Sequence, residues 1–482
     1  MEFRPVNHYV KRLFSQSAIY GIGDIGSKIL TLFLIPIHTY YLTPPEYSIF
    51  TLFILFYSFG LTFYLLGINS GFIRYFLDEG YDNRDVFSTA FLFISMFNMF
   101  LSILIIAFSK ELSEIFFGNI EYSDIFYYGA IILLLESLSS LALLIYRARN
   151  NPVGFVTAII VRISVILVSN LIFLSILKLG LYGAVLGNLT GSVSLLLILS
   201  FEVKKLLHLK FSLRLFKKMF RYGIPTVPAV LSLTMLIMID QYLLKIFGFF
   251  DKVGIYAVGY KMGMALSIII TGFRFAWFPF IFQVSKQKEA QKIFSTVFDY
   301  FNFFLIFFYL LISIYIPLFF KYIFSPVYYE SINLIPIVAL GYIFYGYYEN
   351  FMVGIYIKDR THYIAVVITA AAFLNIVLNL ILIPLYDIYG AAWATAVSYL
   401  LLALLGYFFS QKFYSIKYDF RKILKVISGG TLIMVVNFIL KDVHISVKLS
   451  FPFLYFFVLY LLRFFKADDI NLIRSLFKKD AD

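Results

Sequence analysis

The sequence predicts an all-α integral membrane protein with about fourteen transmembrane helices, and three observations support this fold class. Of the 482 residues, 61% are hydrophobic and only 14% are charged, and the mean hydropathy is +0.88. Soluble domains average roughly 45–50% apolar and 25% charged residues. Fourteen apolar runs each reach the roughly 20 residues that a bilayer-crossing helix needs. The connections between them are too short for a soluble domain. A soluble enzyme, a nucleic-acid-binding protein and a disordered chain are therefore excluded.

The expected spans follow one another along the whole chain. They lie at residues 15–41, 47–72, 86–108, 124–146, 155–177, 181–201, 220–244, 253–276, 294–319, 331–356, 362–383, 389–410, 423–440 and 447–463. The first run is too long, and too polar at Gly21–Lys28, for a cleaved signal peptide, so we expect it to remain as a span. The segment from Lys466 to Asp482 is expected to form a short amphipathic cytoplasmic helix.

The distribution of basic residues predicts the orientation of the chain. With the N-terminus inside, the cytoplasmic segments hold 28 of the 40 Lys and Arg residues and the outer loops hold 7. Cytoplasmic loops of membrane proteins carry an excess of Lys and Arg. We therefore expect both termini in the cytoplasm. The formal net charge of +13 is explained in the same way, without a nucleic-acid partner.

Cofactor and metal chemistry find no support in the sequence. The chain has no cysteine, its five histidines lack ligand spacing, and no P-loop is present, so no cofactor is expected. The stretch Gly21-Ile-Gly-Asp-Ile-Gly26 matches the dinucleotide-binding pattern by letter. That pattern needs a strand before it, whereas here it lies in a membrane span, where its glycines favour a bend or close packing.

Two stretches of similar sequence indicate an internal duplication. Tyr182-Gly183-Ala184 and Tyr389-Gly390-Ala391 are 207 residues apart and open the sixth and twelfth spans. Each continues with small residues four apart, a spacing that lets helix backbones approach closely. Two parallel six-helix copies around a central cavity are a transporter plan. We expect an N-lobe at residues 1–208, a C-lobe at 209–411, and two added helices with the cytoplasmic tail at 412–482.

Ionisable residues inside spans are the candidate functional residues, because a charge is costly in the membrane. A cavity lined by the basic ones would attract anions, and the acidic ones could bind H⁺ or Na⁺ as coupling ions. The basic candidates are Lys28, Arg74, Arg162, Lys261 and Arg274, and the acidic candidates are Asp24, Glu136, Asp240 and Glu349. As alternatives, Asp24 and Lys28 could form an intrahelical ion pair, Arg162 and Glu136 an interhelical one, and Arg74 and Arg274 could extend to the interface.

A tyrosine cluster in the tenth span is a candidate sugar-binding surface. Tyr342, Tyr345, Tyr347 and Tyr348 precede Glu349 and Asn350. A tyrosine ring can stack on the face of a sugar while its hydroxyl forms hydrogen bonds with the sugar's hydroxyl groups. We therefore assign Tyr345, Tyr348 and Asn350 to sugar contact. The alternative is an interfacial aromatic belt.

The chain resembles the polysaccharide-transporter (Wzx-type oligosaccharide flippase) branch of the multidrug/oligosaccharidyl-lipid/polysaccharide (MOP) exporter superfamily. The resemblance covers nearly the whole chain. It is carried by Leu42-Thr-Pro-Pro-Glu-Tyr-Ser-Ile-Phe50, Asp240-Gln-Tyr-Leu-Leu244, Val253-Gly-Ile-Tyr-Ala-Val-Gly-Tyr-Lys-Met262, Leu380-Ile-Leu-Ile-Pro-Leu385 and Tyr389-Gly-Ala-Ala-Trp-Ala-Thr395.

The resemblance implies a two-lobed, V-shaped fold that moves a polyprenyl-diphosphate-linked oligosaccharide across the plasma membrane by alternating access. The product would serve surface polysaccharide biosynthesis, such as lipopolysaccharide, alongside assembly proteins. Cationic groups would hold the diphosphate, and Asp240 and Lys261 match the family's features by position. Asp24 is similar in position to the coupling acid of the related drug exporters.

Three alternatives stay open at this point. A lipid II flippase also has fourteen spans, but its arginine-rich first span is replaced here by Asp24 and Lys28. Multidrug exporters of the MATE type commonly have twelve spans. A membrane-embedded glycan polymerase or ligase typically has a large outer loop, whereas the outer loops here reach only about 15 residues, far below a folded domain.

Overall fold

The computed structural model describes residues 6–440 and 443–465, and within those ranges the chain is helical and contains no strand. The expected helix from Lys466 to Asp482 lies outside the described residues. Twelve helices are long and apolar enough to cross a membrane. The prediction of an all-helical membrane protein is confirmed.

The helices include several shorter than a span. In chain order they are α1 (Val6–Tyr41), α2 (Pro44–Leu65), α3 (Ile68–Phe76), α4 (Asn83–Ala107), α5 (Ser109–Phe117), α6 (Asp124–Ala148), α7 (Pro152–Leu171), α8 (Gly180–Leu206), α9 (Leu213–Gly223), α10 (Val227–Ile246), α11 (Phe250–Gly263), α12 (Leu266–Val284), α13 (Ala290–Ile323), α14 (Leu334–Phe351), α15 (Val353–Ile357), α16 (His362–Phe413), α17 (Phe420–Ile439), α18 (Ile445–Lys448) and α19 (Phe451–Leu461). Short 3₁₀ or π turns join some of them.

The count of about fourteen spans is compatible with these helices. The 52 residues of α16 would extend about 78 Å, more than twice the thickness of a bilayer core. Its backbone breaks at Asp387, where φ is 56° and ψ is −135°, so α16 supplies the expected eleventh and twelfth spans. The expected fourteenth span corresponds to α18 and the 11-residue α19.

Several predicted spans are broken within the described residues, and two of them show how the boundaries differ from the sequence-based ones. The span 47–72 consists of α2 and α3, which are separated by left-handed residues at Leu66 and Gly67. The span 253–276 consists of α11 and α12, separated at residues 264–265, and α12 continues to Val284. Uninterrupted hydropathy does not reveal such a break, because hydropathy reports burial in lipid and not backbone conformation.

The turn after α1 determines where α2 starts. Pro44 stands at the first helical position, where its missing N–H costs nothing. The Glu46 carboxylate accepts hydrogen bonds from the backbone N–H and the hydroxyl of Thr43, both at 2.9 Å. The Thr-Pro-Pro-Glu sequence therefore fixes the beginning of this helix.

The described chain forms two compact units. Unit 1 holds the residues up to Val258 together with Ala372–Ala391, and unit 2 holds Gly259–Ala371 with the residues from Ala392 onward. These boundaries differ from the expected lobes at 1–208 and 209–411. The pseudo-symmetric pair of six-helix lobes stays a prediction.

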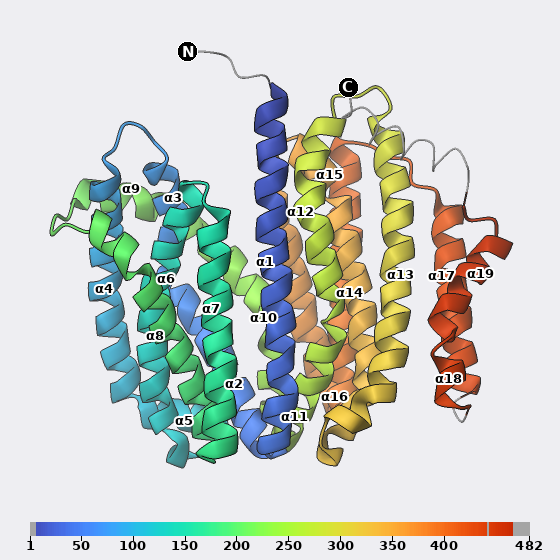
Figure 1. Cartoon of the computed structure of the whole chain (residues 1–482), viewed down its shortest axis with the longest axis horizontal. Coiled ribbons are helices and arrows are strands. Elements are labelled where there is room, and N and C mark those ends of the chain that lie inside the picture. The colour runs from blue at the N-terminus through green and yellow to red at the C-terminus, as the bar shows by residue number, and fades with distance from the viewer. Residues whose placement is uncertain (1–5, 441–442, 466–482) are drawn as a thin grey trace. The chain divides into compact units, whose positions relative to one another are not determined.

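In unit 1, neighbouring helices pack in the order α1, α7, α8, α6, α4 (Figure 1). Gly23 of α1 lies against Val156 of α7, and further along, His38 shares a 2.9 Å hydrogen bond with Asn170. Both contacts join residues 132–133 positions apart, so α1 and α7 run in the same direction. The first and fifth spans are thus parallel, as a chain that crosses the membrane at each span requires.

The small residues of the duplicated stretch mediate close helix packing. A Cβ on Gly187 would lie 2.1 Å from the Asn170 side chain, and one on Gly191 would lie 2.2 Å from Ile166. Both contacts are between α8 and α7. In the second stretch, a Cβ on Gly390 would lie 2.1 Å from the carbonyl oxygen of Leu382. In both stretches, glycine lets a helix approach the preceding one.

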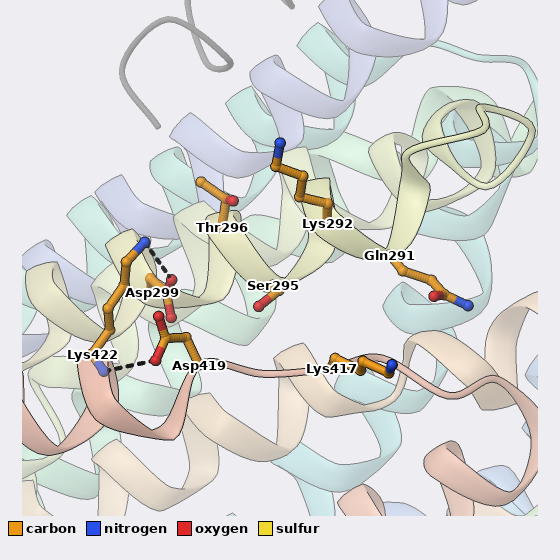
Figure 2. A pocket seen from close by; sticks show the side chains of 8 residues that line it. All are labelled: Gln291, Lys292, Ser295, Thr296, Asp299, Lys417, Asp419 and Lys422. Atoms are coloured by element: carbon orange, nitrogen blue, oxygen red, sulfur yellow. Dashed lines mark hydrogen bonds and ion pairs between the residues drawn. The ribbon is translucent and has the colours of Figure 1, made fainter. Parts of the chain in front are cut away.

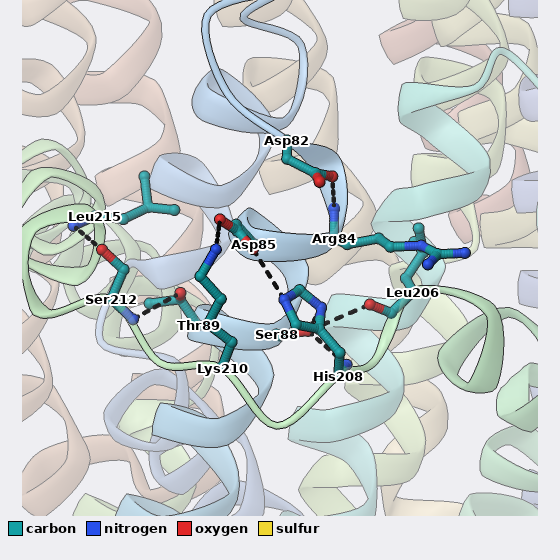
Figure 3. Close-up of polar contacts among 10 residues, drawn as sticks. All are labelled: Asp82, Arg84, Asp85, Ser88, Thr89, Leu206, His208, Lys210, Ser212 and Leu215. Carbon is teal, nitrogen blue, oxygen red and sulfur yellow. Dashed lines mark hydrogen bonds and ion pairs between the residues drawn. The ribbon is translucent and has the colours of Figure 1, made fainter.

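The basic connection between α8 and α9 is fixed to the beginning of α4 (Figure 3). The Asp85 carboxylate contacts His208 Nε2 at 2.9 Å and Lys210 Nζ at 2.6 Å. The backbone N–H of His208 donates to the Ser88 hydroxyl at 2.9 Å, and that of Ser212 donates to Thr89 at 3.3 Å. At least four polar contacts therefore hold this connection against α4 within unit 1.

Unit 2 is built around three mutually packed helices, α12, α13 and α14. The pair α17 and α19 packs against α13, so the C-terminal helices belong to this unit. Aromatic rings fill much of the interior, and Phe298 contacts Tyr347, Phe351 and Tyr418 with ring centroids 4.9–5.3 Å apart.

Candidate functional site

Three of the predicted basic residues are partnered by predicted acidic residues within their own unit. On α1, Lys28 Nζ lies 3.1 Å from Asp24, and both side chains are more than one third exposed. On α7, Arg162 Nη2 lies 2.6 Å from Glu136 of α6. In unit 2, Arg274 of α12 lies 3.4 Å from Glu349 of α14. The anion-binding and ion-coupling candidates are thus largely partners of one another.

The Arg162–Glu136 pair is the centre of a buried polar cluster in unit 1. Ser192 of α8 donates to Glu136 Oε1 at 2.7 Å, and Tyr57 of α2 lies beside both charged groups. The Glu136 side chain is 8% exposed, whereas that of Arg162 is 24% exposed. The buried Nε–H of Arg162 has no acceptor within the described part of the chain. A guanidinium has five N–H donors, so Arg162 can bind a further acceptor.

Lys28 and Arg162 lie at the same depth in unit 1. The parallel register of α1 and α7 brings Lys28 level with residue 161, directly before Arg162. The sequence separates these two cations by 134 residues, and the packing of α1 on α7 brings them to one level.

Arg74 has a different environment from the one expected of a cavity residue. It lies in the last turn of α3, and its guanidinium carbon is 4.9 Å above the ring of Tyr222 in α9. The approach depends on glycine, because a Cβ on Gly223 would lie 2.0 Å from the carbonyl oxygen of Gly67. Arg74 therefore takes part in the contact between α3 and α9.

Asp240 is 1% exposed, and protein groups stabilise its carboxylate. The hydroxyl of Tyr256 donates to Oδ2, and the backbone N–H of Gln241 donates to Oδ1 at 2.8 Å. The contact joins α10 to α11 within unit 1.

The remaining candidates lie in unit 2. Lys261 is half-buried in the last turn of α11. Arg274 is 46% exposed, and its partner Glu349 is 8% exposed and accepts a hydrogen bond from the Tyr345 hydroxyl at 2.8 Å. The side chains of Arg274, Glu349 and Tyr345 therefore form one cluster. Like the cluster in unit 1, it combines a partly exposed guanidinium with a buried carboxylate.

The tyrosines of α14 lie inside unit 2, which does not fit an interfacial belt. Tyr342, Tyr347 and Tyr348 are each less than 10% exposed. The Tyr345 ring contacts those of Tyr348 and Tyr399 at 6.1 and 5.6 Å between centroids. Asn350 is completely buried, and both polar atoms of its side chain are without a hydrogen-bond partner among the described residues. Of the three residues assigned to sugar contact, Tyr345 has the most accessible side chain.

Three hydroxyl side chains lie beside the ionic groups, and the sequence analysis did not predict them as site residues. They are Ser192, Tyr57 and Tyr256. Ser192 and Tyr256 lie within stretches already singled out as motifs, so their polar side chains were visible signals. Tyr57 is one of 38 tyrosines and had no distinguishing signal. Within residues 6–440 and 443–465, no three carboxylate, imidazole or thiol side chains form a metal-binding group.

Comparison with known structures identifies the architecture. A lipid II flippase, MurJ, in an inward closed conformation matches with a TM-score of 0.71 and 15% identity, over 92% of this chain and 98% of that one. An inward-facing multidrug resistance MATE family transporter of the MOP superfamily matches with a TM-score of 0.64 and 14% identity, over 85% and 99% of the two chains. The Vibrio cholerae MATE transporter VcmN, in a mutant form, matches with a TM-score of 0.54 and 13% identity, over 84% and 97%.

Helices that cross the membrane many times, with ionic clusters buried among them, define a multi-pass membrane protein with the fold of MOP-superfamily transporters. A family model described as polysaccharide biosynthesis protein matches residues 40–281, half of the chain. The chain belongs to this family of polysaccharide biosynthesis proteins. No curated protein sequence matches it.

Proposed function

We propose that this protein flips a polyprenyl-diphosphate-linked oligosaccharide from the cytoplasmic to the outer leaflet of the plasma membrane by alternating access. The observation that carries the proposal is one Arg–Glu pair in each unit, Arg162–Glu136 and Arg274–Glu349, with the carboxylate buried and the guanidinium more accessible. Guanidinium groups bind phosphate oxygens in a bidentate manner. Family membership supports the polysaccharide pathway, and the fold supports transport instead of an enzymatic activity.

The same pairs provide a route to coupling with H⁺ or Na⁺. A diphosphate and a carboxylate compete for one guanidinium. A proton or Na⁺ bound at Glu136 would weaken its hold on Arg162 and free the guanidinium for the substrate. Lys28, level with Arg162, and Lys261 in unit 2 would add positive charge, and Tyr345 would contact the sugar. In this proposal both termini lie in the cytoplasm, and assembly proteins receive the product.

The fold of MurJ gives specific support to a second candidate, lipid II transport. Its chemistry is shared, because the diphosphate would meet the same arginines. The MATE-type matches support drug export as a third candidate. Proteoliposomes supplied with a labelled polyprenyl-diphosphate oligosaccharide, with lipid II or with a dye would separate the three, since each predicts movement of a different compound.

Neutralising the pair in unit 1 tests the proposal. The double variant Arg162→Gln/Glu136→Gln keeps both side chains polar and leaves no unpaired buried charge. We expect at least a tenfold loss of flipping, because a charge-assisted hydrogen bond contributes about 1.5–3 kcal/mol. The measurement is leaflet exchange of the labelled donor in proteoliposomes, read out with an enzyme that does not cross the bilayer.

The matched control is Arg149→Gln/Glu202→Gln, a second Arg–Glu pair of unit 1, in which the Arg149 side chain is 42% exposed and the N–O distance is 2.5 Å. It should flip the donor at the wild-type rate. Wild-type flipping by the Arg162 variant would rule out substrate contact by this pair. If the wild-type protein moved no oligosaccharide donor, even with an imposed H⁺ or Na⁺ gradient, this result would contradict the proposed function itself.

A further inference from the structure

A polar pocket of about 380 Å³ lies in unit 2, apart from the ionic clusters described above (Figure 2). Its walls are the first turns of α13, the segment 414–419 and the first turn of α17. Further lysines lie within ten residues before each of these helices. They are Lys286 and Lys288 before α13 and Lys412 before α17. Both basic segments are expected on the cytoplasmic side, and the pocket joins them within one unit.

The two carboxylates of the pocket already bind protein groups. Asp299 is 2% exposed and lies 3.2 Å from the ammonium of Lys422, which is 8% exposed. Asp419 caps α17 and accepts hydrogen bonds from the backbone N–H groups of Arg421 and Lys422 at 3.1 and 3.2 Å. Lys422 balances the charge of Asp299, although Asp299 Oδ1 has no hydrogen-bond partner among the described residues. Three lysines and two carboxylates line the pocket, so its net charge favours an anion over a cation.

Two hydroxyls in the pocket wall lack protein partners. Ser295 and Thr296 are 8% and 6% exposed, and neither hydroxyl makes a hydrogen bond to another described residue. Many other hydroxyls in these helices donate to a carbonyl one turn earlier, as Ser398 does at 2.6 Å. The hydroxyl oxygens of Ser295 and Thr296 are not among the fully buried unpartnered atoms, so both can reach a molecule in the pocket. Two such donors facing one pocket indicate a ligand that accepts hydrogen bonds.

Two ammonium groups at the pocket are available to an anion. Lys292 and Lys417 are exposed, and neither forms an ion pair with any residue that the structure describes. Since Lys422 neutralises Asp299, these two charges outnumber the single remaining carboxylate, Asp419. Hydroxyl and ammonium donors together suit a tetrahedral anion with several acceptor oxygens.

We propose that this pocket binds a phosphate group, with Lys292, Lys417, Ser295 and Thr296 as the donors to its oxygens. The phosphate could belong to the headgroup of an anionic phospholipid or to a free phosphate ester. Phe420 and Leu424 of α17 are 65% and 67% exposed directly after Asp419, and they would accommodate an acyl chain beside the headgroup. The proposal is independent of the substrate assigned above, because it uses none of the same residues.

Binding to the purified full-length protein in detergent tests the proposal. The probes are dioctanoyl-phosphatidylglycerol and inorganic phosphate, and dioctanoylglycerol reports binding by the acyl chains alone. We expect Lys292→Ala/Lys417→Ala to weaken binding of the phosphate-bearing probe at least tenfold, because two charge-assisted contacts are lost. Lys286→Ala/Lys288→Ala removes the same charge from exposed positions outside the pocket and should bind as the wild type does.

A second variant separates a built site from general attraction to basic loops. Ser295→Ala/Thr296→Val removes both hydroxyls without changing charge, and it should weaken binding while heat stability stays at the wild-type level. Pocket-dependent binding of phosphatidylglycerol alone would identify a lipid headgroup, and pocket-dependent binding of phosphate would identify a soluble ester. The proposal is overturned if neither probe binds or if the pocket variants bind as the wild type does. It is also overturned if Lys286→Ala/Lys288→Ala weakens binding as much as Lys292→Ala/Lys417→Ala.

Discussion

At the scale of single residues, pairing decides what each charged side chain does. The sequence places Glu136 and Arg162 inside spans but leaves open whether they bind a substrate, a coupling ion or each other. Their 2.6 Å contact shows that they bind each other, and the Arg162 side chain is 24% exposed, as the proposed contact with a substrate requires. Asp240 is buried beside Tyr256, whose hydroxyl donates a hydrogen bond to its carboxylate. Burial of this kind depends on neighbours distant in sequence.

The most buried ion pair gives a prediction about stability. Lys422→Met leaves Asp299 as an uncompensated charge at 2% exposure. Removing one partner of a buried pair costs about 3–5 kcal/mol. We expect less monodisperse protein after heating, measured by size-exclusion chromatography. The double variant Lys422→Met/Asp299→Asn should recover much of the loss, and a single variant as heat-resistant as the wild type would contradict the prediction.

At the scale of helices, hydropathy predicts where the chain crosses the membrane, and glycine contacts decide how the helices meet. The small-residue stripe of α8 was expected to pack closely, and Gly187 and Gly191 do contact α7. The approach of α3 to α9 was not expected, because the sequence places them in different spans. It depends on two glycines, Gly67 and Gly223, that are 156 residues apart.

Gly223→Ala tests the contact between α3 and α9. The added Cβ would lie 2.0 Å from the carbonyl oxygen of Gly67, so the backbones must separate. Overpacking typically costs about 1–3 kcal/mol, and we expect a lower midpoint of unfolding in sodium dodecyl sulfate. Gly26→Ala is the matched control, since no atom lies within 4 Å of its Cβ position. Equal midpoints for the two variants would show that the contact does not require glycine.

At the scale of the whole molecule, the fold persists at 13–15% identity to transporters of known structure. Lipid as a solvent favours helices whose backbone groups bond internally and small residues where helices meet, and many different sequences satisfy these requirements. Basic residues add the orientation, and their bias favours an N-terminus and a C-terminus in the cytoplasm.

The absence of native cysteine makes the orientation directly measurable. Glu121 and Lys288 are exposed residues in segments expected outside and inside, respectively. A membrane-impermeant maleimide on intact cells should label Glu121→Cys, and it should label Lys288→Cys only after permeabilisation. The cysteine-free wild type is the control for background. The reverse pattern would invert the predicted topology and place the phosphate pocket on the outer side.

The amino-acid sequence was enough to predict an all-helical membrane protein, because composition and span length decide whether a chain dissolves in lipid. It also supplied the charged residues from which the candidate sites are built. Only the tertiary structure decided which charges are paired, which rings are buried, and that residues from α13 and α17 enclose one polar pocket. Those properties depend on distances between residues far apart in the chain, and a sequence records the order of residues but not their distances in space.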